Sequence, residues 1–238
     1  MIKAIFFDMF GTLVDWRGSI IDIAKKLKVR SFENINWELF VIRWRLKYNP
    51  VLNKVNRNIL EWNLLDVLHR KTLDEVIKEM KIESLSEKDC EILVNSWHKL
   101  KGWKDSKEGL KSLKNKYATA TLSNANVNLQ KDLIKENGFE FDFLFSAEHF
   151  RKYKPAIEVY TGAASYLNLK TSNCALVASH KNDLYAAAKL GFKTIFIERQ
   201  QEYGNYKHLF KENNFEADIK LLSLNNIEME LKKFLIRV

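Results

Sequence analysis

The sequence has only two cysteines, Cys90 and Cys174, among its 238 residues. They lie far apart in the chain, and neither belongs to a Cys-x-x-Cys pair. This spacing excludes a disulfide framework and a cysteine-based metal site. Cys174 stands in an apolar run and is typical of a small core residue.

The sequence also lacks an apolar run near the roughly 20 residues that a membrane-spanning helix needs. Its first three residues, Met1-Ile2-Lys3, lead directly into a strand-like segment, so no signal peptide is expected. We therefore expect a cytoplasmic protein without a membrane partner.

Glycine and proline are scarce as well, with 8 and 2 residues. Together they are 10 of 238 residues, about 4%, where about 12% is usual. Tight turns must then use Asn and Asp, and each glycine that is present becomes informative. We draw no functional conclusion from this scarcity.

Acidic residues are fewer than basic ones, 30 against 39, which gives a formal net charge of +9 and a pI near 9.3. The basic residues are spread along the chain between acidic ones. No arginine-rich arm, zinc-finger spacing or RNA-binding aromatic motif is visible. We therefore expect no nucleic-acid partner, although a positive field favours encounter with a small anion.

What the sequence does contain is one apolar strand, then helices, then strands that alternate with helices. The first strand is predicted at residues 4–7, and residues 17–97 follow with apolar side chains at helical spacing. Further strands are predicted at 117–122, 141–145, 175–178 and 193–197, with helices between them at 108–115, 128–137, 156–167 and 184–190. This alternation predicts an α/β fold, a doubly wound parallel sheet with a helical insertion after the first strand.

Helix ends inside the insertion are predicted from prolines and capping residues. The helix over residues 37–48 should end at Asn49-Pro50. Thr72, with an acidic residue three positions later, predicts a helix N-terminus, and Ser86 predicts another in the same way. Residues 221–235 predict a last helix that packs on the core.

A carboxylate ends the first strand. Asp8 therefore lies at the carboxyl edge of the sheet, where open α/β sheets bind ligands. Gly11 permits a sharp turn and Thr12 supplies a hydroxyl nearby. Right-handed crossovers bring the other strand ends to this edge, and these carry Ser123, Asn124, Ser179 and His180. The alternative is that Asp8 only caps a turn.

Four motifs in order resemble those of the haloacid dehalogenase superfamily, which contains many magnesium-dependent phosphatases and a smaller group of 2-haloacid dehalogenases. They are Asp8-Met9-Phe10-Gly11-Thr12-Leu13-Val14-Asp15, Thr121-Leu122-Ser123-Asn124, Lys152-Tyr153-Lys154-Pro155 with Val159-Tyr160, and Val177-Ala178-Ser179-His180-Lys181-Asn182-Asp183-Leu184. Further similarity to the type II haloacid dehalogenases lies in residues 14–17, 44–45, 65–70 and 199–204.

Two acids that the phosphatases of this superfamily usually carry are absent. Phe10 stands where they have a general acid, and Ser179 stands where they have an Asp that holds magnesium. Asp183, the acid that both branches keep, is present. The resemblance therefore implies attack at carbon without a metal or another cofactor, because a leaving halide needs no proton.

The resemblance also implies a role for each site residue. Asp8 would attack the halogen-bearing carbon and form an ester, which water then hydrolyses with Asp183 as its base or orienter. The other roles are halide binding by Arg45 and Asn124, carboxylate binding by Ser123, Lys154 and amides near Phe10-Gly11, positioning by Tyr160 and Thr12, and a pocket lining of Phe10, Ser179, His180 and Asn182.

Structural interpretations stay open beside these roles. They are a strand-end turn for Ser123, a solvated lysine for Lys154, a solvated basic face for Arg45 with Arg43 and Lys47, and closure of a turn for His180. His69, His149 and the Trp residues at helical positions are expected to be structural.

The predicted organisation is a core domain of residues 1–15 and 99–238 and a helical cap domain of residues 16–98. The predicted function is hydrolytic dehalogenation of a short 2-haloalkanoic acid, a small anionic substrate. One alternative is a magnesium-dependent phosphatase that uses Asp8 and Asp183, and another is a non-catalytic member that binds an anion or a partner protein. A homodimer is compatible with the resemblance, because related enzymes are often dimers.

Overall fold

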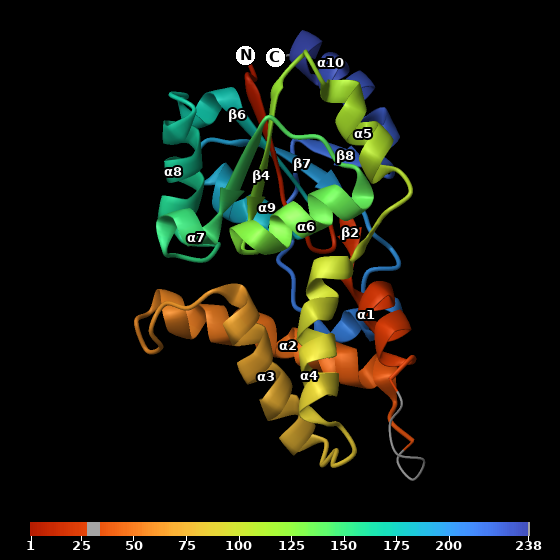
Figure 1. The fold of residues 1–238 in the computed structure, drawn as a ribbon. Helices are drawn as coiled ribbons and strands as arrows, with labels where there is room; N and C mark the ends of the chain where they lie inside the picture. The colour runs from red at the N-terminus through yellow and green to blue at the C-terminus, as the bar shows by residue number, and fades with distance from the viewer. Residues whose placement is uncertain (28–33, 238) are drawn as a thin grey trace.

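The computed structural model describes residues 1–27 and 34–237. Its centre is a six-stranded sheet in the order β5-β4-β1-β6-β7-β8, and every neighbouring pair of strands is parallel (Figure 1). The strands are β1 (Ala4–Phe7), β4 (Ala118–Ser123), β5 (Phe143–Ser146), β6 (Cys174–Ala178), β7 (Lys193–Ile197) and β8 (Ile219–Leu221). The middle strand, β1, is buried along its whole length, as its apolar sequence predicts.

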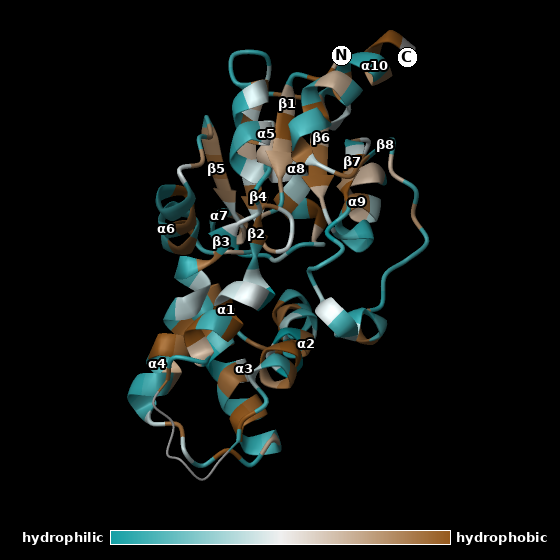
Figure 2. Ribbon diagram, turned by 90° about the vertical axis from the view of Figure 1, so that its right-hand side faces the viewer, coloured by the Kyte–Doolittle hydropathy of each residue, from teal (hydrophilic) through white to brown (hydrophobic). Residues whose placement is uncertain are grey.

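Helices cover both faces of this sheet. They are α5 (Ser106–Leu113), α6 (Val127–Asn137), α7 (Ala147–Phe150), α8 (Ile157–Tyr166), α9 (Lys181–Ala188) and α10 (Ile227–Arg237). Along β1, Ile5 and Phe7 belong to one hydrophobic cluster and Phe6 to another, because alternate side chains point to opposite faces. Figure 2 shows hydrophobic strands such as β6 enclosed by helices with polar outer residues. The predicted doubly wound α/β fold is therefore confirmed.

Between β1 and β4 the chain leaves the sheet and forms a separate group of helices, below the sheet in Figure 1. They are α1 (Trp16–Ala24), α2 (Trp37–Asn56), α3 (Leu65–Glu79), α4 (Glu87–Asn95) and the short 3₁₀ helix η1 (Ser96–Lys99). An antiparallel ribbon of β2 (Val14–Asp15) and β3 (Lys101–Gly102) joins this group to the sheet. The helical insertion is therefore confirmed, while the division into domains at residues 16 and 98 stays a prediction.

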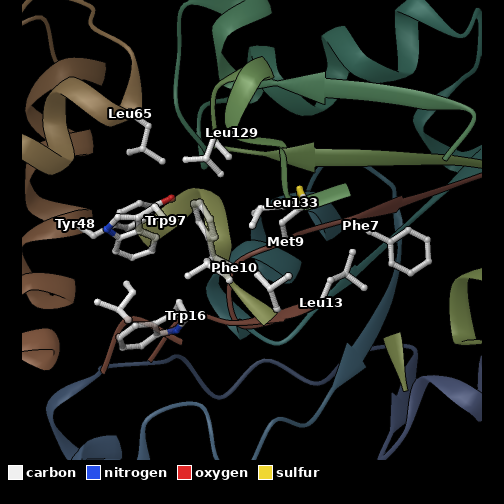
Figure 3. Close-up of a cluster of buried hydrophobic side chains, with 14 of the residues drawn as sticks. Phe7, Met9, Phe10, Leu13, Trp16, Tyr48, Leu65, Trp97, Leu129 and Leu133 are labelled. Carbon is white, nitrogen blue, oxygen red and sulfur yellow. The ribbon is translucent and has the colours of Figure 1, made fainter. Parts of the chain in front are cut away.

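One hydrophobic cluster continues from the sheet into the helical insertion (Figure 3). Phe7 and Leu133 lie at its sheet side, and Phe10 contacts Trp97 with ring centroids 5.2 Å apart. His69 stacks on Trp97 at 4.0 Å, which agrees with its predicted structural role. This shared core holds the helices against the edge of the sheet where Asp8 lies.

The helix α2 does not end at Asn49-Pro50 as predicted but runs on to Asn56 with Pro50 inside it. Proline has no N–H, so the carbonyl of Leu46 loses its usual helical partner. The apolar face nevertheless continues beyond the proline, with Val51 and Val55 buried. Burial of this face outweighs the local cost of the proline.

The predicted helix start at Thr72 is also wrong, because Thr72 lies in the middle of the continuous helix α3. Its hydroxyl donates back to the carbonyl of Leu68 at 2.9 Å and accepts a hydrogen bond from the Trp44 indole at 3.1 Å. A buried tertiary contact therefore uses the group that would otherwise cap a helix. The predicted start at Ser86 is confirmed, since Ser86 and Asp89 form a capping box at α4.

The end of the chain differs from the prediction as well. Residues 219–221 form β8, a sixth strand that the sequence did not indicate, and the last helix begins only at Ile227. A strand of three residues is too short to give a clear alternation. No helix in residues 1–27 and 34–237 has the length and apolar character needed to cross a membrane.

Candidate active site

Asp8 follows β1 at the carboxyl edge of the sheet, between the ends of β4 and β6. It is 6% exposed, and three side chains contact its carboxylate. Lys154 Nζ lies 2.9 Å from Oδ1, while Thr12 Oγ1 donates to Oδ2 at 2.8 Å and His180 Nδ1 lies 3.3 Å from the same oxygen. Burial by itself would raise the Asp8 pKa, but Lys154 and His180 outweigh it and hold that pKa well below its usual value. Asp8 is therefore an ionised carboxylate out of water.

Lys154 joins Asp8 to a second carboxylate. Its ammonium also contacts Asp183, whose other oxygen accepts a hydrogen bond from Tyr160 at 2.6 Å. Burial lowers the Lys154 pKa, but the two carboxylates have the larger effect and raise it above its ordinary value. The backbone N–H of Lys154 donates to Asn124 at 2.7 Å, which fixes the loop before α8. The solvated alternative for Lys154 is therefore wrong.

Arg45 extends from α2 into the same site. Its guanidinium lies 4.0 Å from the Tyr48 ring centroid and 5.3 Å from that of Trp16. Its buried Nη1 has no hydrogen-bond partner among the described residues. The neighbouring basic residues differ, because Arg43 is exposed and Lys47 pairs with Glu79. Arg45 is thus a partly buried cation on an aromatic platform, with one buried N–H group available to an anion.

A cavity of about 900 Å³ opens beside these groups. Its wall includes most of the predicted site residues, namely Asp8, Phe10, Arg45, Asn124, Lys154, Tyr160, His180, Asn182 and Asp183. The amide of Asn182 is already used, since it donates to the carbonyl of Lys211 and accepts from the N–H of Asn213. Asn182 therefore holds a loop over the cavity in addition to lining it.

Three predicted residues lie behind the cavity wall. Ser123 Oγ is fully buried and accepts from the N–H of Ala125 at 3.1 Å. The Ser179 hydroxyl lies 3.3 Å from Glu202, and the Ser179 N–H donates to Thr12 Oγ1 at 2.9 Å. A supporting role fits Thr12 as predicted, whereas direct substrate contact by Ser123 and Ser179 stays a prediction that this geometry does not favour.

Glu202 is the main site residue for which the sequence predicted no role. It is 1% exposed and accepts hydrogen bonds from the Trp16 indole at 2.9 Å and from His180 Nε2 at 2.8 Å. Burial raises its pKa, but the imidazole of His180 reverses this and lowers it. The signal that could have found it is the similarity over residues 199–204, which includes Glu202.

His180 bridges Asp8 and Glu202, so it does more than close a turn. Burial lowers its pKa, but the two carboxylates dominate and raise it to about 10. The folded state therefore keeps a proton that the unfolded chain loses near pH 6.5. This stabilising contribution is complete below pH 6.5 and is lost as the pH rises through about 10.

We expect the free energy of unfolding to fall by roughly 2–4 kcal/mol between pH 7 and pH 10 because of His180. Urea denaturation at several pH values measures this slope. In the His180→Gln variant the alkaline loss should be much smaller. Equal slopes in the two proteins would contradict the bridge.

Gly11 is required by the close approach of Glu202. Its φ is +78°, and a Cβ added to it would lie 2.1 Å from Glu202 Oε1. The Gly11→Ala variant should therefore lose about 3 kcal/mol of unfolding free energy, measured by urea denaturation. Gly191→Ala is the matched control, since Gly191 also has positive φ but its nearest contact is 3.4 Å away; it should lose only about 1 kcal/mol. Similar losses in both variants would mean that the Glu202 contact is unimportant.

The donors at this site do not fit a magnesium ion bridging Asp8 and Asp183. The ammonium of Lys154 lies between these carboxylates. Among residues 1–27 and 34–237, no group of three or more His, Cys, Asp or Glu side chains is arranged to hold a metal. The arrangement instead suits chemistry on an anionic substrate that two fixed cations, Lys154 and Arg45, can bind.

Comparison with known proteins places this geometry in a family. A family model for haloacid dehalogenase-like hydrolases matches residues 2–191. The chain is 26% identical over 213 residues to (S)-2-haloacid dehalogenase 4A of Burkholderia cepacia, covering 87% of both chains. It is 35% identical to the crystal structure of the L-2-haloacid dehalogenase PA0810, with all of both chains covered and a TM-score of 0.86. For the defluorinating L-2-haloacid dehalogenase Rha0230 the identity is 32%, the coverage 97% and 95%, and the TM-score 0.89. The chain therefore belongs to the haloacid dehalogenase-like hydrolases.

Proposed function

We propose that this protein hydrolyses 2-haloalkanoic acids, including short ones, to 2-hydroxy acids through an ester on Asp8, without a metal. One observation carries the proposal: an ionised, buried Asp8 shares a cavity with Arg45, whose buried Nη1 has no hydrogen-bond partner in the described part of the chain, while Phe10 offers no proton. Its relatives named (S)-2-haloacid and L-2-haloacid dehalogenases support the same substrate class.

In the first step, a carboxylate oxygen of Asp8 attacks C2 of the substrate. The new C–O bond forms as the carbon–halogen bond breaks, and the halide leaves with the electron pair of that bond. Because Asp8 attacks from the side opposite the halide, the configuration of C2 is inverted. Arg45 would receive the halide, because its Nη1 is a buried donor that no described residue pairs with. The carboxylate nucleophile is effective here because it is desolvated and held by Thr12 and Lys154.

In the second step, water attacks the carboxyl carbon of the Asp8 ester. The acyl C–O bond then breaks, and one proton of the water passes to the leaving alkoxide oxygen, which releases the 2-hydroxy acid. The other proton goes to solvent, which restores the Asp8 carboxylate. Lys154 lies beside this carboxyl group and would stabilise the negative charge that develops on its oxygen. Asp183 would take the proton from water or orient the attacking water, with Tyr160 holding its other oxygen.

The direct test is halide release from 2-chloropropionate in the presence of EDTA. We expect turnover under these conditions and no phosphate release from a panel of phosphate esters with magnesium. Magnesium-dependent phosphate release would instead support the phosphatase alternative. If both assays are silent and an anion still shifts the melting temperature, the non-catalytic alternative is favoured. Closure of the helical insertion over the site, a homodimeric state and a cytoplasmic location stay predictions.

A further inference from the structure

The cavity is much larger than a short haloacid requires. A 2-halopropionate has six non-hydrogen atoms. If each of them takes up no more than the volume of one water molecule in the liquid, about 30 Å³, the acid occupies on the order of 150 Å³. The cavity measures about 900 Å³, a size typical of sites for ligands several times larger. A short acid would therefore leave most of it filled with water.

The space that remains leads away from the charged groups along α9. Asp183, Ala186 and Leu190 all line the cavity. They recur at intervals of three and four residues, so they follow one side of the helix and the turn after it. At 1.5 Å per residue this wall extends about 10 Å from Asp183. The cavity is thus a groove with Asp8 and Arg45 at its inner end.

Large apolar side chains remain exposed in this outer part of the groove. Ile157 at the start of α8 is 59% exposed, Tyr185 of α9 is 43% exposed, and Leu209 at the end of the 3₁₀ helix η3 (Gly204–Leu209) is 40% exposed. The ammonium of Lys189 lies over the Tyr185 ring, 4.2 Å from its centroid. Apolar residues gathered on a concave wall usually cover an apolar ligand group.

We infer that the outer groove binds the alkyl tail of 2-haloalkanoic acids with about six to eight carbon atoms, and that this protein prefers them to three-carbon acids. The length follows from the 10 Å wall, since an extended chain advances about 1.3 Å per carbon atom. The inference rests on the proposed function, because Asp8 and Arg45 fix the reacting end of the acid.

The experiment compares kcat/KM for bromide release from 2-bromopropionate, 2-bromohexanoate and 2-bromooctanoate. Each methylene group that moves from water into a fully closed site improves binding about three- to fourfold. In a half-open groove, each methylene group gains only about half of the corresponding binding free energy. We therefore expect kcat/KM for 2-bromooctanoate to be about tenfold or more above that for 2-bromopropionate.

Two variants test where the tail binds. Ile157→Asn places a polar group on the groove wall and should lower the octanoate-to-propionate ratio of kcat/KM about tenfold. Ile59→Asn is the matched control, because Ile59 is also 59% exposed but does not line the groove. This control should leave the ratio unchanged.

The outcomes separate the two proposals. Turnover of 2-bromopropionate with poorer turnover of 2-bromooctanoate overturns the groove assignment and leaves the proposed function in place. Bromide release from none of the acids overturns the proposed function, and calorimetric titration with octanoate then decides the groove independently. If the wild-type protein binds octanoate and Ile157→Asn binds it more weakly, the groove assignment is supported. If the wild-type protein does not bind octanoate, the groove assignment is overturned.

Discussion

The Asp8→Asn variant is expected to lose at least about 10⁴-fold in kcat for halide release from 2-chloropropionate. A neutral amide is a very weak nucleophile, so the ester cannot form. The loss should fall on kcat, because Arg45 and Lys154 remain in place to bind the substrate anion. Halide release under saturating substrate measures it, and mass spectrometry of the quenched wild-type protein should detect the ester on the peptide that contains Asp8.

The control for this variant is Asp22→Asn, which removes an exposed carboxylate that pairs with Lys101 at 3.4 Å. Its activity should equal that of the wild type within twofold. Removing the Asp8 charge also leaves the Lys154 and His180 cations less compensated, so urea denaturation must show that Asp8→Asn is folded under assay conditions. A folded Asp8→Asn protein with wild-type turnover would mean that Asp8 is not the nucleophile.

Replacing Arg45 with Met should lower kcat/KM for 2-chloropropionate about 10³-fold, which corresponds to about 4 kcal/mol of transition-state stabilisation. The leaving halide gains a full negative charge in a site with little water, and Arg45 supplies a buried donor that has no partner within residues 1–27 and 34–237. Methionine keeps much of the packing against Tyr48 and Trp16, so the fold should survive. Initial rates of halide release over a range of substrate concentrations measure the effect.

Arg43→Met is the matched control, because Arg43 is exposed on the same helix two positions away. It should change kcat/KM by less than twofold at moderate ionic strength. The unfolding free energy of Arg45→Met should stay close to that of the wild type, since the lost cation–aromatic contacts are offset by removal of a partly buried charge. Equal activity in the two variants would assign halide binding to another group.

The sequence predicted five of the six strands of the sheet and the residues at its edge, because both follow from local patterns. The apolar run of β1 ends at Asp8, and the strand ends at Ser123 and Ser179 place their neighbours beside it. The parallel topology then needs only the right-handed crossover rule. The contact between Lys154 and Asp8 came from resemblance to a family motif, since no local pattern links these two positions.

Other features depend on contacts between distant parts of the chain. The hydroxyl of Thr72 would cap a helix in isolation, but in the fold it accepts from the Trp44 indole. The local sequence could not decide which of Arg43 and Arg45 points into the site, because each stands between two apolar residues. Glu202 reaches His180 from a loop after β7, and only the folded chain brings them together.

The ribbon of β2 and β3 has a consequence for how the helical insertion of this enzyme can be exchanged during evolution. Val14 pairs with Gly102 and Asp15 with Lys101, so the segments that leave and re-enter the core run side by side. The intervening helices are attached as a side branch with adjacent ends. A branch of different length or sequence could be exchanged between these points without moving Asp8, Lys154 or Asp183, and the part of the cavity wall that α2 supplies, including Arg45, would be replaced in a single genetic event.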